Sequence, residues 1–152
     1  MRVLIHDYSG HPFQVQLSRS LAARGHEVLH LYSGSIPTPQ AMMSRRANDP
    51  LSFQVRALTI SKPVAKYDYL RRFMQELAYA RLLEKAAMAY GPAVVICSNT
   101  PIDIASRLAR LCRRRSVPWI YWLQDLYSVA IERYFGPKVP ILGPLVSLHY
   151  AK

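Results

Sequence analysis

Cysteine is scarce in this chain of 152 residues, which contains only two. Cys97 lies in a short apolar run and Cys112 in a segment with helical periodicity, and their spacing matches no metal-binding motif. Because free cysteine is among the most often buried residue types, both are predicted to be small core residues. We therefore expect no disulfide and no metal site, and we expect a reducing compartment.

Long apolar segments are also missing. The opening run is only about four residues long before His6 and Asp7 interrupt it, which is too short for a signal peptide. No stretch approaches the ~20 apolar residues that a membrane-spanning helix needs. These absences predict a protein that is soluble or peripheral to a membrane. Internal repeats and low-complexity tracts are absent as well.

Acidic residues are few, because nine Asp and Glu stand against 20 Lys and Arg, for a formal net charge of +11. Such a surplus on a small domain creates a positive field over part of its surface. We therefore expect anionic partners, which could be nucleic acid, acidic phospholipid or a phosphorylated small molecule. Net charge alone leaves these three open.

What the chain does contain is an alternation of short apolar runs with helical patterns, and 51% hydrophobic residues for one core. Runs without polar alternation are typical of parallel strands covered on both faces. Their alternation with helices predicts an α/β domain over residues 1–152, a doubly wound parallel sheet in a Rossmann-like three-layer sandwich. The expected strands are 2–6, 27–32, 53–60, 93–97 and 119–123, and the expected helices are 12–24, 67–90 and 101–115, with a long loop at 33–50.

Two of these helices carry apolar residues at helical spacing, which is the pattern of a face that packs on a sheet. In the helix 12–24 the face consists of Phe13, Leu17 and Leu21. In the helix 67–90 it begins with Leu70, Phe73, Met74, Leu77 and Leu83. Gly25 and Gly91 follow the two helices as predicted stop signals.

The pattern weakens after Asp125, with a short helical stretch to Tyr134, a loop at 136–144 and a helix at 145–152. The last helix begins with apolar residues that two turns cannot bury. We therefore expect that the chain continues and that its partner, a C-terminal domain, is missing here.

Ligands of open parallel sheets bind at the carboxyl ends of the strands, where the strand order reverses. The first loop at such an end contains Gly10 but lacks the G-x-G-x-x-G spacing of dinucleotide-binding loops, which disfavours a dinucleotide cofactor. Gly10 serves either the turn alone or the approach of an anion to a helix N-terminus. The rule selects three loops, which are residues 6–11, residues 98–101 and the pair Gln124 and Asp125.

Each polar residue in these loops has a structural and a functional interpretation. His6 and His11 bind phosphate or sugar hydroxyls, or they are satisfied by the backbone. Thr100 is explained as a helix N-cap, which leaves the amide of Asn99 for a sugar hydroxyl or a phosphate. Asp125 either caps a helix or is the acidic residue of the crevice.

Basic residues interleave with aromatic residues at the start of the helix 67–90. On an anionic membrane surface such charges contribute about 1 kcal/mol each, and an ordinary solvated face is the alternative. The cluster consists of Lys62, Lys66, Arg71 and Arg72. Arg113, Arg114 and Arg115 end another helix, where cations are favourable without any ligand.

An ordered set of segments carries a family resemblance: the opening Arg2 to Ile5, the stretch from Gly10 to Gln14, Arg24 to Val28, Ser98 to Pro101, and Trp122 to Leu126. Together they resemble the N-terminal half of family 4 glycosyltransferases, nearest to the colanic-acid-type enzymes of bacterial polysaccharide assembly. The resemblance covers almost the whole chain.

The resemblance implies the GT-B architecture, in which two Rossmann-like domains face each other across a cleft, and retention of anomeric configuration. It implies that this chain is the acceptor-side domain, inactive alone and without a cofactor of its own, and that the absent C-terminal domain binds a nucleotide-sugar donor. From their place in the three loops, the expected catalytic residue is Asp125, and the expected substrate-binding residues are Gly10, His11, Ser98, Asn99, Thr100 and Gln124.

Two departures limit what can be carried over. Many relatives have His-Asp where this chain has Gln124 and Asp125, and Gly-Gly where it has Ser9 and Gly10. The expected acceptor is a polyprenyl-diphosphate-linked sugar or another growing glycan, met peripherally at the cytoplasmic face of the inner membrane. The membrane-facing residues would be Lys62, Lys66, Arg71 and Arg72.

A freestanding Rossmann-like binding module for an anionic ligand or a protein partner is the alternative to an enzyme half. Nucleic acid is not expected as a partner, because the basic residues are spread over several elements and no recognised nucleic-acid motif is present.

Overall fold

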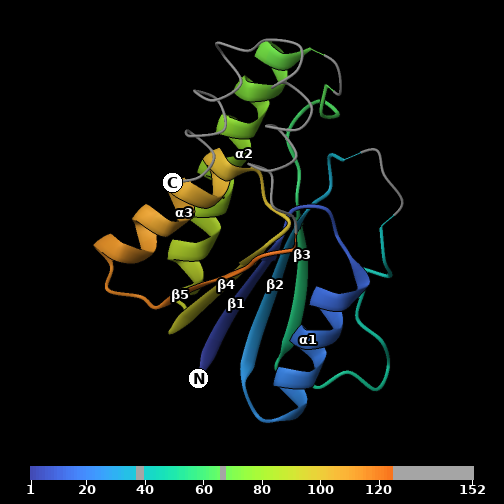
Figure 1. The fold of residues 1–152 in the computed structure, drawn as a ribbon. Helices are drawn as coiled ribbons and strands as arrows, with labels where there is room; N and C mark the ends of the chain where they lie inside the picture. The colour runs from blue at the N-terminus through green and yellow to red at the C-terminus, as the bar shows by residue number, and fades with distance from the viewer. Residues whose placement is uncertain (37–39, 66–67, 125–152) are drawn as a thin grey trace. The chain divides into compact units, whose positions relative to one another are not determined.

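A five-stranded parallel sheet runs through the computed structural model, which describes residues 1–36, 40–65 and 68–124 (Figure 1). Residues 1–122 form one compact unit. Leu123 and Gln124 belong to a second unit and are exposed. Asp125 and the elements predicted after it lie outside the described residues, as does Lys66.

The strand order is β3-β2-β1-β4-β5, so the chain builds outward from β1 in one direction and then returns to build in the other. This confirms the predicted doubly wound α/β fold. The predicted boundaries are correct to within two residues. The elements are β1 (Arg2–Asp7), α1 (Pro12–Ala23), β2 (Glu27–Ser33), β3 (Phe53–Leu58), α2 (Tyr69–Tyr90), β4 (Val94–Ser98), α3 (Ile102–Arg114) and β5 (Trp119–Trp122).

Helices cover both faces of the sheet, with α1 on one face and α2 and α3 on the other (Figure 1). Successive side chains of a strand point to opposite faces, so β1 contributes Val3 and Ile5 to the core under α1 and Leu4 to the core under α2 and α3. Strand β1 is therefore buried on both sides, as its apolar sequence predicts.

The predicted apolar face of α1 is wrong in part. Phe13 is 60% exposed, and Leu17 and Leu21 are half-buried. The buried face of the helix instead contains the polar residues Gln14 and Ser18. These side chains find hydrogen-bond partners on the sheet beneath them, which is why the helix can bury them.

The apolar face predicted for α2 is correct only in the second half of the helix. Leu83 is buried, but Leu70 is 76% and Met74 58% exposed. Figure 1 shows the first turns of α2 extending beyond the carboxyl ends of the strands, where no sheet lies beneath them. The Asp68 carboxylate accepts from the backbone N–H of Arg71 at 3.0 Å, and this cap starts the helix at Tyr69 rather than at residue 67.

Helix α2 ends where the sequence predicts. Gly91 adopts φ 63° in the left-handed region, and its N–H donates to Ala87 O at 3.0 Å. A glycine takes this conformation without the steric cost of a Cβ atom.

Candidate functional site

The strand order reverses between β1 and β4, and the two loops that the sequence analysis selected there lie next to each other. Asp7 at the end of β1 is in register with Ser98 at the end of β4. The loop after Asp7 leads into α1, and the loop after Ser98 leads into α3. The structure therefore brings Gly10, His11, Ser98, Asn99 and Thr100 to one edge of the sheet.

The Asp7 carboxylate is the centre of the first loop. It accepts hydrogen bonds from the backbone N–H groups of Ser9, at 3.2 Å, and of His11 and Gly10. Burial raises the pKa of Asp7, and these hydrogen bonds act against that rise without cancelling it. The N–H groups that the sequence suggested for an incoming anion are thus donors to a carboxylate of the chain itself.

Gly10 serves the turn of the first loop, and its role toward a ligand stays a prediction. Its φ is +77°, and a Cβ atom there would lie 3.3 Å from the side chain of Gln40. Gln40 comes from the long loop after β2, and its amide donates to Ser33 O at 2.7 Å. The close approach that a glycine permits is therefore made by Gln40 of this chain. This contact ties the long loop to the loop that contains Gly10.

His6 is held by two side chains rather than by the backbone. Its Nε2 lies 3.0 Å from Tyr79 Oη and its Nδ1 lies 2.9 Å from Thr100 Oγ1. The Thr100 hydroxyl donates to Ser98 O at 2.8 Å, so it accepts from His6. His6 therefore carries its hydrogen on Nδ1 and accepts from Tyr79 at Nε2.

The network keeps these groups uncharged. Burial lowers the pKa of His6 to about 3, with a further contribution from His30. Burial also raises the pKa of Cys97, whose thiol donates to Thr100 Oγ1, to about 12, and that of Tyr79 well above its usual value. His6, Cys97, Tyr79 and Thr100 thus form a neutral polar cluster that joins β1, β4 and α2.

The prediction that Thr100 caps α3 is wrong. Pro101 occupies the N-cap position, and no side chain caps the helix there. The Thr100 hydroxyl turns back to Ser98 O and His6 because both lie beneath it at the strand ends. The residue is fully buried, which a cap at the surface would not be.

Asn99 is the polar residue of the second loop that the fold does not use. Its backbone has φ +47°, a left-handed conformation that asparagine tolerates better than most residues. Its Nδ2 is buried and has no hydrogen-bond partner among the described residues. Strained backbone of this kind concentrates at functional sites. Asn99 therefore keeps the free hydrogen-bonding capacity that the sequence analysis assigned to it.

Sequence reasoning missed a polar layer under α1. Gln14 Nε2 donates to Ser98 Oγ at 2.6 Å. Ser18 donates to Gln14 O and therefore accepts from His30 Nδ1 at 2.7 Å. Burial lowers the pKa of His30 to about 4, with help from Arg19. The signal in the sequence was the spacing of Gln14 and Ser18, one turn apart beside Val15.

Helix α2 contacts the first loop at Tyr8, the residue that follows β1. The Tyr8 ring meets Tyr79 edge to face, with centroids 4.9 Å apart. Burial raises the pKa of Tyr8 to about 12, and the nearby Glu76 adds to the shift. Glu76 accepts from Arg72 Nε at 2.8 Å. Of the predicted membrane-facing residues, Arg72 is therefore engaged beside the crevice, whereas Lys62 and Arg71 are exposed.

Several polar groups at the carboxyl ends of β1 and β4 are already used within the chain. His6 is neutral and bonded at both ring nitrogens, Cys97 is a protonated thiol, and Asp7 is surrounded by amides. The groups left for a ligand are the side chains of Ser9, His11 and Asn99, which suit hydroxyl groups. In the part of the chain that the structure describes, no group of three or more His, Cys, Asp or Glu could hold a metal ion. Within that same part, no helix is long and apolar enough to cross a membrane.

Comparison with known proteins identifies the fold and a family. The family model of the glycosyl transferase 4-like domain matches residues 11–152. No curated protein sequence matches the chain. Among solved structures, it is similar to the C-terminal domain of a hydrogenase from Pyrococcus furiosus, with 13% identity and a TM-score of 0.57 over 80% of this chain and 91% of that domain. At this identity the likeness concerns the fold alone.

Proposed function

The chain belongs to the glycosyl transferase 4-like domain family and forms a glycosyltransferase N-terminal domain, and we propose that it is the acceptor-side half of a retaining enzyme with GT-B architecture. In this proposal a second Rossmann-like domain binds the nucleotide-sugar donor and completes the catalytic site. The acceptor is a sugar on a polyprenyl diphosphate or a growing glycan, as in colanic-acid-type polysaccharide assembly. This chain alone binds the acceptor and transfers nothing.

The observation that supports this proposal best is the meeting of two loops at the carboxyl ends of β1 and β4, where the strand order reverses. The side chains of Ser9, His11 and Asn99 on these loops are not fully buried, and their polar groups suit sugar hydroxyls. The backbone amides of the first loop are already bonded to Asp7, so this loop is not free to cradle a nucleotide diphosphate. A site of this kind favours the acceptor over the donor. The catalytic role of Asp125 is part of the proposal.

Binding of an acceptor should be visible in the amide NMR spectrum of the chain. The probe is a short-chain, water-soluble polyprenyl diphosphate that carries one sugar. We expect shifts concentrated at residues 8–11 and 98–100, and none on addition of nucleotide-sugar donors. The matched variants are Asn99→Ala, which should weaken binding at least about tenfold through loss of its hydrogen bonds, and Asn48→Ala in the exposed long loop, which should not.

A nucleotide sugar that shifts these loops while the lipid-linked sugar does not would overturn the acceptor assignment. Shifts at these loops with simple anions alone would instead favour a freestanding module that binds an anionic ligand.

The first turns of α2 support the proposed position at the inner face of the membrane. Leu70, Phe73 and Met74 are exposed apolar residues on these turns, and Lys62 and Arg71 are exposed cations near them. Apolar side chains and cations together bind an anionic lipid surface. Because α2 also borders the crevice through Glu76 and Tyr79, a lipid-linked acceptor would arrive beside the site.

Vesicle sedimentation tests this position. We expect the chain to sediment with vesicles that contain anionic lipid, to release with added salt, and to remain in solution with neutral vesicles. Replacing Leu70 and Phe73 by Ser should reduce the bound fraction at least about fivefold, since both side chains leave the lipid. Phe13→Ser, a change at an exposed ring on the opposite face of the sheet, is the control. Equal losses for both variants, or equal binding to neutral vesicles, would contradict the proposal.

A further inference from the structure

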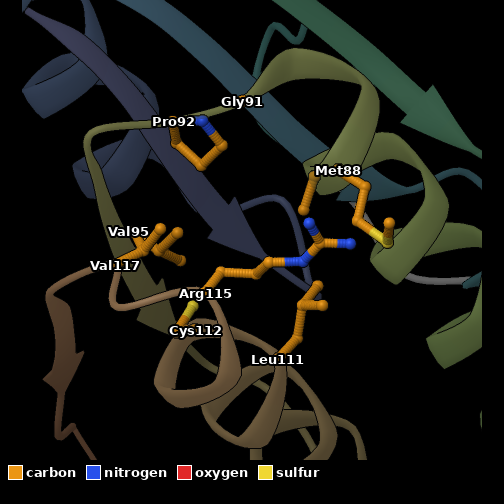
Figure 2. A pocket seen from close by; sticks show the side chains of 9 residues that line it. Met88, Gly91, Pro92, Val95, Leu111, Cys112, Arg115 and Val117 are labelled. Carbon is orange, nitrogen blue, oxygen red and sulfur yellow. The ribbon is translucent and has the colours of Figure 1, made fainter.

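A second site lies at the amino ends of the strands, between the ends of α2 and α3. Figure 2 shows an apolar pocket there, and its volume is about 170 Å³. Gly91 and Pro92 precede β4 and Val117 precedes β5, so the pocket faces the amino ends of the strands. Its lining residues are Ala87, Met88, Gly91, Pro92, Val95, Leu111, Cys112, Arg115 and Val117.

One arginine lines this pocket, and three more line the groove beside it. Figure 2 shows the Arg115 side chain lying across it, with the guanidinium between Met88 and Leu111. Met88 and Leu111 also line a neighbouring groove of about 430 Å³, to which Arg107, Arg110, Arg114 and one acidic residue, Glu84, contribute. The apolar pocket and the basic groove therefore form one continuous surface on α2 and α3.

Most of this positive charge is not neutralised by the described part of the chain. Arg107 pairs with Glu84 at 2.8 Å, but no ion pair joins Arg110, Arg114 or Arg115 to any described carboxylate. Arg110 and Arg114 lie one helical turn apart, where like charges destabilise a helix. A net charge of +11 adds to the same positive field. Charge complementarity thus points to an anionic occupant.

The size of the pocket decides what kind of occupant fits. An apolar cavity of about 150 Å³ in another protein holds one benzene molecule, so this pocket takes one ring or one branched side chain. The long acyl chain of a membrane lipid is several times larger. A short acidic segment of a protein presents one large apolar side chain together with carboxylates, which matches both the pocket and the arginines.

We propose that this surface docks an acidic segment of a partner protein. One leucine-sized or aromatic side chain enters the pocket, and flanking carboxylates pair with Arg110, Arg114 and Arg115. The surface is separate from the acceptor crevice, because β4 begins beside the pocket and ends at Ser98. The inference therefore stands independently of the proposed transfer reaction.

Fluorescence anisotropy tests the proposal with labelled pentapeptides and the full chain. The probe is Glu-Glu-Leu-Glu-Glu, and its twin has Ala in place of Leu. We expect the leucine peptide to bind at least about tenfold more tightly, since three more carbon atoms are buried. Val117→Phe, which fills the pocket, should abolish that preference while leaving the fold intact by circular dichroism.

Charge variants separate the site from the general positive field. Arg115→Glu should weaken the leucine peptide at least about tenfold. Arg113→Glu makes the same charge change on the same turn but lines neither cavity, and it should cost less than about threefold. Equal affinity for the two peptides, or equal effects of the two variants, would overturn the proposal. Binding of anionic vesicles through Arg115, with no peptide binding, would also overturn it in favour of a lipid surface.

Discussion

Lowering the pH from 8 to 5 is expected to reduce the free energy of unfolding by about 4 kcal/mol. Burial lowers the pKa of His6 to about 3 and that of His30 to about 4, from 6.5 in an unfolded chain. At pH 5 both histidines gain a proton on unfolding but hold none in the folded state. Each histidine therefore lowers the free energy of unfolding by about 2 kcal/mol at that pH. This figure is nearly the same for any folded-state pKa well below 5.

The sign follows from the direction of these shifts. A histidine whose pKa is depressed in the folded state contributes stability above pH 6.5, and this stability is lost as the pH falls toward its folded pKa. Urea unfolding at half-unit intervals between pH 8 and pH 5 measures the slope. The raised pKa of Asp7 acts in the opposite sense, so Asp7→Asn isolates the histidine contribution. A flat profile in that variant would show that neither histidine is buried in its neutral form.

Asp7→Ala is expected to destabilise the domain by about 2 kcal/mol. The backbone N–H groups of Ser9, Gly10 and His11 lose their acceptor, and the loop between β1 and α1 loses the group that closes it. Removing the buried carboxylate also removes the free energy that its desolvation costs. The net destabilisation is therefore smaller than the cost of three unpaired amides.

The matched control is Asp7→Asn, which keeps one carbonyl oxygen as an acceptor and should lie within about 1 kcal/mol of the parent. Amide hydrogen exchange gives a readout specific to the loop. Exchange at residues 9–11 should accelerate at least about tenfold in Asp7→Ala relative to Asp7→Asn. The amides exchange from the open form of the loop, and this form is more populated in Asp7→Ala. Equal exchange in the two variants would mean that another group closes the loop.

The sequence was sufficient for the architecture and for the meeting of the two loops at the carboxyl ends of β1 and β4. Short uninterrupted apolar runs such as Val3 to Ile5 are typical of strands buried on both faces, and such strands have helices on both sides of a parallel sheet. The positions of the strand ends then follow, because all carboxyl ends of a parallel sheet lie at one edge. The meeting of Gly10 with Ser98 and Asn99 was predictable for that reason.

Side-chain partnerships could not be predicted in the same way. Gln14 hydrogen-bonds to Ser98, which is 84 positions away, and His6 to Thr100, which is 94 positions away. Hydrophobic periodicity contains no information about such pairs. The same limit explains why Phe13 and Leu70 were expected to be buried. Whether an apolar helix face meets the sheet depends on where the helix lies relative to the strand ends.

Strand β5 has a consequence for the behaviour of this chain in solution. Its sequence Trp119–Trp122 carries no charge, Ile120 is 52% exposed, and among the described strands it pairs with β4 alone. An uncharged, apolar edge is a template for pairing between molecules. Mutual repulsion from a net charge of +11 opposes that association, and dissolved salt screens the repulsion. We therefore expect the colloidal stability of the chain to depend on its surplus of arginine and lysine and to decrease as ionic strength rises.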